Sequence, residues 1–208
     1  GAMPRTHRPA AQRREEILDA AHTLFTTKGF QPTTMEDILR IVGIAKGTLY
    51  YHFPSKEQIL KALVLRIVHQ VEQQARAIAA SPAPAADKLA AIMSAMRLVD
   101  TETELVDQFH APGNAEFHLL SITAMIEHLT PVLAEVITQG VAEGAFTTER
   151  PHDVIELLLS ASGILLDQDI MKSSPAELAR RQETLIWASE TLLGAEPGSL
   201  GFLTKAEP

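Results

Sequence analysis

The sequence contains no cysteine, so neither a disulfide framework nor a thiolate metal site can form. This absence fits a reducing compartment and predicts a cytoplasmic protein. The longest stretch of low polarity, Leu157–Leu166, is interrupted by serines and is far shorter than the roughly 20 residues that a transmembrane helix needs. No basic start followed by an apolar run marks a signal peptide. We therefore expect a soluble protein without a membrane partner.

Motifs of the common enzyme classes are also missing. There is no G-x-S-x-G nucleophile elbow, no glycine-rich phosphate loop and no strand pattern that would carry either. A catalytic triad could be composed of a serine, a histidine and Asp167, but no spacing in the sequence singles out which serine or which histidine would take part. We therefore expect no catalytic residues.

One segment, residues 33–56, has the pattern of two short helices joined by a glycine turn. Thr33 and Glu36 have the S/T-x-x-E spacing of a capping box, and apolar residues follow at helical intervals. A helix should therefore start near Met35 and end before Gly43, which supplies the turn.

The second short helix, Ala45–Phe53, is expected to lie against DNA. Leu49 and Phe53 share an inward face, while the other faces are polar, aromatic and basic. Reading B-DNA needs side chains on base edges, held in place by contacts to phosphate. The expected phosphate contacts are Thr34, Lys46 and Lys56. The residues expected to allow close approach or to reach bases and sugars are Gly47, Thr48, Tyr51 and His52. The alternative for Lys56 is a solvated helix start.

The net charge of −8 is unevenly distributed. Residues 1–60 hold 8 Lys and Arg and 6 Asp and Glu, which gives +2, whereas residues 61–208 hold 10 and 20, which gives −10. This asymmetry places the nucleic-acid face near the start of the sequence. The acidic remainder would repel DNA elsewhere and orient its docking.

The run GTLYYHF at residues 47–53, followed by SKE at residues 55–57, resembles the helix-turn-helix signature of the TetR family of bacterial transcriptional repressors. Thr33, Thr34 and Gly43 are also in register with it. The resemblance covers about the first quarter of the chain. It implies a ligand-responsive regulator, a repressor that binds a palindromic DNA operator as a homodimer and is released by a small effector.

The resemblance also implies that Tyr50 contacts phosphate, although a core tyrosine with a satisfied hydroxyl is the alternative. A second alternative concerns the whole protein: a helical ligand- or metal-binding protein whose DNA head is inactive. The intact set of Thr34, Lys46, Tyr50 and Lys56 argues against it.

The expected fold is all-α, with a three-helix head and a larger helical body. The expected parts are a tag remnant and flexible arm (1–12), a helix-turn-helix DNA-binding domain (13–56), a helical effector-binding and dimerisation domain (57–193) and a flexible tail (194–208). The expected helices besides the two short ones are Arg13–Lys28, Ser55–Ala80, Asp87–Phe109, Ala115–His128, one from Pro131 to near Gly144, Pro151–Lys172 and Pro175–Leu193.

In the expected helical body, the spacing of the histidines indicates a possible ligand site. His110, Asn114 and His118 are spaced by four, and with Asp167 they could hold zinc, nickel or another divalent ion if the backbone stays helical through residues 112–113. An organic effector, or no small ligand, is the alternative. The apolar residues expected around such a site are Phe109, Phe117 and Met125. No required cofactor is expected.

The last two expected helices carry wide apolar faces. Small residues in the first and bulky ones in the second would permit close packing in a four-helix dimer interface, which the resemblance favours over an ordinary core. The residues expected at this interface are Ser160, Gly163, Leu185 and Trp187.

Overall fold

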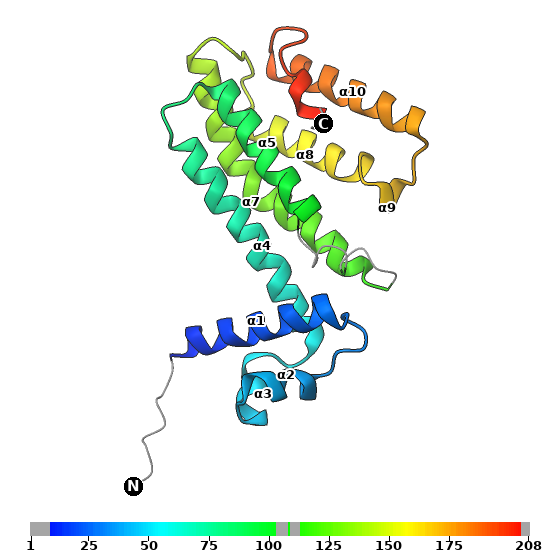
Figure 1. Cartoon of the computed structure of the whole chain (residues 1–208). Coiled ribbons are helices and arrows are strands. Elements are labelled where there is room, and N and C mark those ends of the chain that lie inside the picture. The colour runs from blue at the N-terminus through cyan, green and yellow to red at the C-terminus, as the bar shows by residue number, and fades with distance from the viewer. Residues whose placement is uncertain (1–8, 103–107, 109–112, 205–208) are drawn as a thin grey trace. The chain divides into compact units, whose positions relative to one another are not determined.

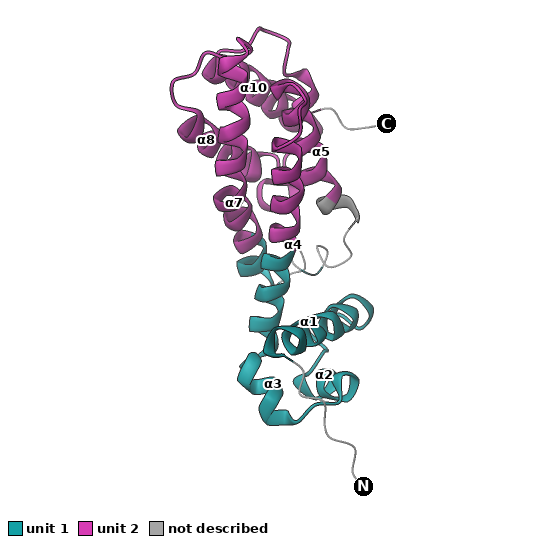
Figure 2. Ribbon diagram, turned by 90° about the vertical axis from the view of Figure 1, so that its left-hand side faces the viewer, with its two compact units in different colours: residues 1–66, 103–118 teal, residues 67–102, 119–208 magenta. Residues whose placement is uncertain are grey.

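The computed structural model describes residues 9–102, 108 and 113–204. The described residues form helices and connecting turns, which confirms the predicted all-α class. They fall into two compact units: unit 1 comprises residues 1–66 and 103–118, and unit 2 comprises residues 67–102 and 119–208 (Figure 2). Two helices, α4 and α7, contribute residues to both units.

Unit 1 contains the three head helices, which are α1 (Ala10–Thr27), α2 (Met35–Val42) and α3 (Lys46–His52) (Figure 1). Gly43 adopts a left-handed conformation, with φ 69°, that ends α2 as the sequence predicts. Phe25, Ile38 and Leu49 are fully buried between the helices. The short α3 is therefore held by packing and not by its own helix propensity.

The capping box of α2 differs from the predicted pair by one residue. Thr34 and Asp37 form it, not Thr33 and Glu36. Thr33 is buried, and its hydroxyl donates a hydrogen bond to the carbonyl of Gly29 at 2.6 Å. Because Thr33 is needed in this turn, the next threonine becomes the N-cap.

The remaining helices are α4 (Lys56–Ala79), α5 (Ala85–Glu102), α7 (Ala115–Ala142), α8 (Pro151–Leu165), α9 (Gln168–Met171), α10 (Pro175–Leu193) and the 3-10 helix η1 (Gly201–Thr204) (Figure 1). Ser55 caps α4 as predicted, because its hydroxyl oxygen accepts from the N–H of Gln58. The core of unit 2 includes Ile92, Leu129, Leu133 and Ile137.

The sequence predicts one helix before Pro131 and another that starts there, but the structure has a single helix, because α7 continues through Pro131. The proline ring is exposed, while Leu129, Val132 and Leu133 around it are buried. Proline removes one hydrogen bond of the helix, but the apolar residues on both sides stay in the core, and their burial outweighs that loss. Among the described residues, α7 is also the one helix long and apolar enough to span a membrane. A buried core helix passes the same test of length and composition.

The helix predicted over Pro151–Lys172 is two helices, because Asp167 starts a new one. Its carboxylate oxygen accepts from the N–H groups of Asp169 and Ile170, which caps α9. Lys172 then ends α9 in a left-handed conformation, with φ 47°.

The predicted flexible tail is folded as far as Thr204. Leu200 is buried in the core of unit 2, and Phe202 and Leu203 pack against it. The Arg97 guanidinium on α5 donates to the carbonyl oxygen of Leu203 at 3.0 Å. Apolar burial and this backbone contact hold η1 in place.

Contacts within each unit hold α4 at two points along its length. In unit 1, Arg66 binds the carboxylates of Asp19 at 2.7 Å and Glu15 at 3.0 Å. In unit 2, Lys88 is only 4% exposed. Its ammonium donates to the carbonyl oxygen of Ala79 at 2.6 Å and to the amide oxygen of Gln139 at 2.7 Å. This lysine therefore ties the last turn of α4 to α7.

Candidate nucleic-acid interface and effector pocket

The start of α2 is held by an ion pair around Asp37. The Lys28 ammonium lies 2.7 Å from its carboxylate, and the backbone N–H of Thr34 donates to the same oxygen at 2.9 Å. The Lys28 hydrogen bond first, and then that of Thr34, lower the pKa of Asp37 from 3.8 to about 2. The ionised carboxylate stabilises the fold above its ordinary pKa, and this contribution is lost as the pH falls through about 2.

This arrangement changes the expected role of Thr34. Its backbone N–H, one of the two groups through which Thr34 could contact a phosphate, donates to Asp37. Its hydroxyl oxygen accepts from the N–H of Asp37 at 3.2 Å. The side chain remains exposed at the positive end of α2, so a contact from the hydroxyl proton to phosphate stays a prediction.

The outer face of α3 carries most of the residues predicted to contact DNA. Tyr51 is 83% exposed, and its ring meets the edge of His52, with 5.4 Å between the ring centroids. Lys46 lies 3.6 Å from Glu36 of α2, with its ammonium 5.9 Å from the ring of exposed Tyr50. The structure thus brings aromatic, hydroxyl and cationic groups together on one short helix.

Gly47 lies in this helix with open space beside it. A Cβ atom built there has no heavy atom within 4 Å. Nothing in the described part of the protein therefore requires a glycine at this position, and its predicted role in the close approach of DNA stays a prediction.

Lys56 has contacts within the head. Its ammonium donates to the carbonyl oxygens of Phe30 at 2.9 Å and Gln31 at 2.8 Å, and it lies 4.5 Å from the centre of the Phe30 ring. These contacts hold the first turn of α4 to the loop between α1 and α2. The predicted contact of Lys56 with phosphate stays a prediction.

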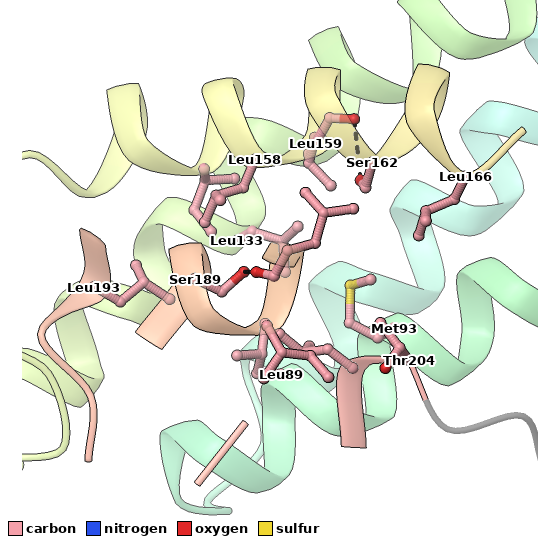
Figure 3. Close-up of a pocket in the computed structure, with 14 residues that line it drawn as sticks. Leu89, Met93, Leu133, Leu158, Leu159, Ser162, Leu166, Ser189, Leu193 and Thr204 are labelled. Carbon is pink, nitrogen blue, oxygen red and sulfur yellow. Dashed lines mark hydrogen bonds between the residues drawn. The ribbon is translucent and has the colours of Figure 1, made fainter. Parts of the chain in front are cut away.

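Unit 2 contains an apolar pocket of about 100 Å³. It lies between α5, α7, α8, α10 and η1, and leucines from several of these helices point into it (Figure 3). The lining residues are Leu89, Met93, Leu133, Ile155, Leu158, Leu159, Ser162, Leu166, Leu185, Ile186, Ser189, Leu193, Leu203 and Thr204. Among these residues none is charged. The sequence did not point to this pocket, although the apolar run at Leu200–Leu203 was a usable signal that the tail packs.

The predicted effector residues lie elsewhere. His110 and Phe109 lie outside the described residues. Asn114 is buried in unit 1 and donates to the carbonyl oxygen of Gln108 at 2.5 Å. Phe117 packs edge-on against Phe30, with 5.8 Å between the ring centroids. Asn114 and Phe117 are therefore core residues of the head.

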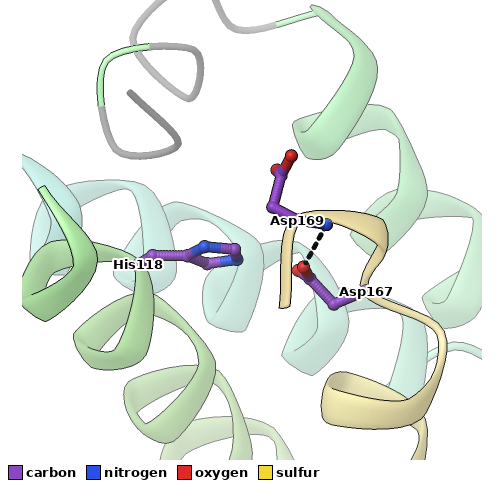
Figure 4. Close-up of side chains that lie close together, drawn as sticks. All are labelled: His118, Asp167 and Asp169. Carbon is purple, nitrogen blue, oxygen red and sulfur yellow. Dashed lines mark hydrogen bonds between the residues drawn. The ribbon is translucent and has the colours of Figure 1, made fainter. Parts of the chain in front are cut away.

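The other three residues predicted for the effector site lie in the described part of the protein. Met125 packs against the core of unit 2. His118 is buried in the first turn of α7, in unit 1. Asp167 caps α9 in unit 2, and Figure 4 shows its carboxylate bonded to the N–H of Asp169. Each side chain has a defined place within its own unit.

The residues predicted at the dimer interface divide into two groups. A Cβ on Gly163 would lie 3.2 Å from Ile122 of α7, and Leu185 lines the pocket, so both face the interior of unit 2. Ser160 is half-buried and donates to its own helix. Trp187, in contrast, is 65% exposed, as is Leu157 at 58%, a residue that the sequence analysis did not select.

Two family models match the chain. The model described as bacterial regulatory proteins, tetR family, matches residues 17–63, and the tetracyclin repressor-like C-terminal domain matches residues 97–185. The first match contains the helix-turn-helix and the second contains much of the body.

Individual proteins agree with these models. The HTH-type transcriptional repressor KstR2 of Rhodococcus jostii is 36% identical over 147 residues, which cover 66% of this chain and 69% of KstR2. The biofilm operon negative regulator IcaR of Staphylococcus epidermidis is 45% identical over 51 residues, which cover 24% of this chain and 28% of IcaR. Among solved structures, RolR in complex with resorcinol has a TM-score of 0.66 at 17% identity, and 96% of each chain is covered.

Proposed function

Because the chain belongs to the TetR family of bacterial regulatory proteins, a family of DNA-binding repressors and not of enzymes, we propose that it represses transcription as a homodimer on a two-fold symmetric operator. A small effector bound in unit 2 would release it from DNA. The observation that carries the proposal is the outer face of α3, where Thr48, Tyr51 and His52 lie beside the open Gly47. For this activity we expect the protein in the cytoplasm, with the DNA.

The operator should be two-fold symmetric because α3 is short. A helix of seven residues reaches too few base pairs for specific recognition, and two copies related by a two-fold axis double the contact. The half-sites then lie in major grooves about one turn, or ~34 Å, apart. Binding should weaken steeply as salt rises, since phosphate contacts release counterions.

Gly47→Ala should lower operator affinity at least tenfold without lowering stability. The added Cβ meets no atom of the described protein, and alanine favours a helix over glycine by up to about 1 kcal/mol. If the backbone of α3 comes close to DNA, the same methyl group blocks that approach. Fluorescence anisotropy on the operator selected by the wild-type protein from a random DNA pool, with a thermal unfolding curve, measures both effects.

Gly201→Ala is the matched control, because a Cβ at Gly201 also meets nothing within 4 Å but lies far along the chain in η1. It should leave DNA affinity unchanged in the absence of effector. Unchanged affinity of Gly47→Ala would contradict the placement of α3 against DNA. A wild-type protein that selects no DNA at low salt would instead support the alternative of an inactive head.

The effector site that we propose is the apolar pocket of unit 2. Half of its lining residues, from Leu133 to Leu185, lie within the region matched by the C-terminal family model, and an apolar lining with a few hydroxyl groups suits a small organic molecule. RolR, which shares the fold, has been solved in complex with resorcinol. Release of DNA requires that the effector bind the DNA-incompetent arrangement more tightly, and DNA must then weaken effector binding by the same factor.

A divalent metal is the second candidate on the grounds of the sequence: His110, Asn114 and His118 are spaced by four, and imidazole and carboxylate groups such as those of His118 and Asp167 are ligands that zinc and nickel accept. Calorimetric titration with each metal decides the matter. Heat that is lost in both His118→Ala and Asp167→Asn, and kept in the control Asp153→Asn on α8, would establish the metal. The Asn variant retains an oxygen to cap α9. No heat, or heat that both variants retain, leaves the pocket as the effector site.

A further inference from the structure

We propose that the pocket of unit 2 takes an uncharged molecule of about the size of one aromatic ring, and that η1 closes over this molecule as a movable wall. This inference rests on the proposed function, since it names the class of effector for that site.

The lining decides the charge of the ligand. Apart from three hydroxyl-bearing residues, the described residues around the pocket are Leu, Ile and Met. A carboxylate or ammonium moved from water into such a site would lose its hydration without gaining a partner, which is strongly unfavourable. A neutral apolar molecule gains free energy from the same transfer.

The hydroxyls allow one polar group on the ligand. Ser189 is buried, and its hydroxyl donates to the carbonyl oxygen of Leu185 at 2.6 Å, while Ser162 donates to that of Leu159 at 3.2 Å. The hydroxyl proton of each serine is already donated to a carbonyl oxygen of its own helix, but the hydroxyl oxygen has lone pairs that can accept a hydrogen bond. The O–H of a phenol can therefore donate to the serine oxygen. A phenol should then bind more tightly than the same ring without a hydroxyl, by the contribution of one hydrogen bond.

The volume decides the size of the ligand. An apolar cavity of about 150 Å³ engineered in another protein holds benzene. The pocket measures about 100 Å³, so a single ring fits only if one wall moves outward. Larger polycyclic molecules would need several walls to move.

The wall most able to move is η1. The other walls are longer α-helices, whereas η1 has four residues, of which Leu203 and Thr204 line the pocket. It is attached to α5 by Arg97, whose guanidinium donates to the carbonyl oxygens of Phe202 at 3.5 Å and Leu203 at 3.0 Å. Breaking these contacts leaves η1 held by the packing of Phe202 and Leu203 alone, so it can move more easily while the helices stay packed.

Three fluorinated probes test the ligand class by ¹⁹F NMR on the full chain. We expect 4-fluorophenol and fluorobenzene to bind, with the phenol tighter, and 4-fluorobenzoate to show no binding. Ser189→Leu fills the pocket and should abolish binding of both neutral probes. Thr191→Leu, on the exposed side of the same helix, is the matched control and should leave binding unchanged.

The same probes test the moving wall through the dissociation rate. Arg97→Met keeps the length of the side chain but removes the guanidinium, and it should raise the dissociation rate of fluorobenzene at least tenfold. Arg180→Met, on the exposed side of α10, should leave the rate unchanged. A folded Arg97→Met variant with the wild-type rate overturns the role of η1 and leaves the pocket in place.

The outcomes separate the two proposals. If no neutral probe binds the wild type, this inference is overturned, while the proposed repressor function still depends on the operator-binding measurement alone. If benzoate binds as well as the phenol, the ligand class is wrong while the pocket stands. Binding of the neutral probes that Ser189→Leu retains would place their site elsewhere and overturn the inference.

Discussion

Replacing Trp187 with glutamate should convert the protein into a monomer and lower its operator affinity at least a hundredfold. Trp187 on α10 and Leu157 on α8 are exposed by 65% and 58%, and neither lines the pocket. The two helices pack against each other within unit 2, so their outer sides offer large apolar groups to a second copy of the chain. A carboxylate buried there without a partner would cost several kcal/mol.

Sedimentation velocity and operator binding together test this expectation. Leu119→Glu is the control, since Leu119 is exposed to a similar degree, by 55%, but lies on α7. It should leave both the dimer and the affinity intact. A Trp187→Glu variant that stays dimeric and binds DNA normally would show that the interface lies elsewhere. A charge at Gly163 is a poorer test, because its Cβ would press on Ile122 within the chain and disturb the fold.

The second large effect concerns stability, at Gly140 near the end of α7. A Cβ at this position would lie 2.3 Å from the ring of Phe146 and 3.2 Å from the Cβ of Ala85. Phe146 is buried, so the ring must leave its place or the backbone must shift. We expect Gly140→Ala to destabilise the protein by about 3 kcal/mol. Thermal unfolding should then show a midpoint roughly 6–12 °C lower.

Two further variants show whether the clash is the cause. Gly201→Ala adds a methyl group in the same unit where no atom lies within 4 Å, and it should not lower the midpoint. Adding Phe146→Leu to Gly140→Ala removes the ring that is struck, so the double variant should be more stable than additivity predicts. A midpoint of Gly140→Ala equal to that of the wild type would contradict this account of the packing.

The head could be predicted because its signals are local. The left-handed glycine at Gly43, the apolar spacing of α2 and the cap at Ser55 each depend on residues only a few positions apart. The sequence pattern predicts the capping box one residue too early, because Thr33 and Thr34 are both good N-caps. What separates them is the burial of Thr33 and its bond to Gly29, and the local pattern does not contain that contact.

The body was harder to predict because its decisive contacts are distant in sequence. Pro131 suggests a helix start, and only the burial of the residues on both sides of it shows why α7 continues. The pocket needs residues from five elements and a tail that packs back on α5. The histidine spacing was a local signal, but Asn114 proved to be a buried residue of the head. No rule of spacing supplies these partners.

The clamp of Lys88 on the last turn of α4 has a mechanical consequence. With 24 residues, α4 is a single helix about 36 Å long. Lys56 holds its first turn and Arg66 holds its middle through contacts in unit 1, while Lys88 holds its last turn in unit 2. Because no loop interrupts the helix between these contacts, any bend between them must be made by the helix itself and would strain its backbone hydrogen bonds.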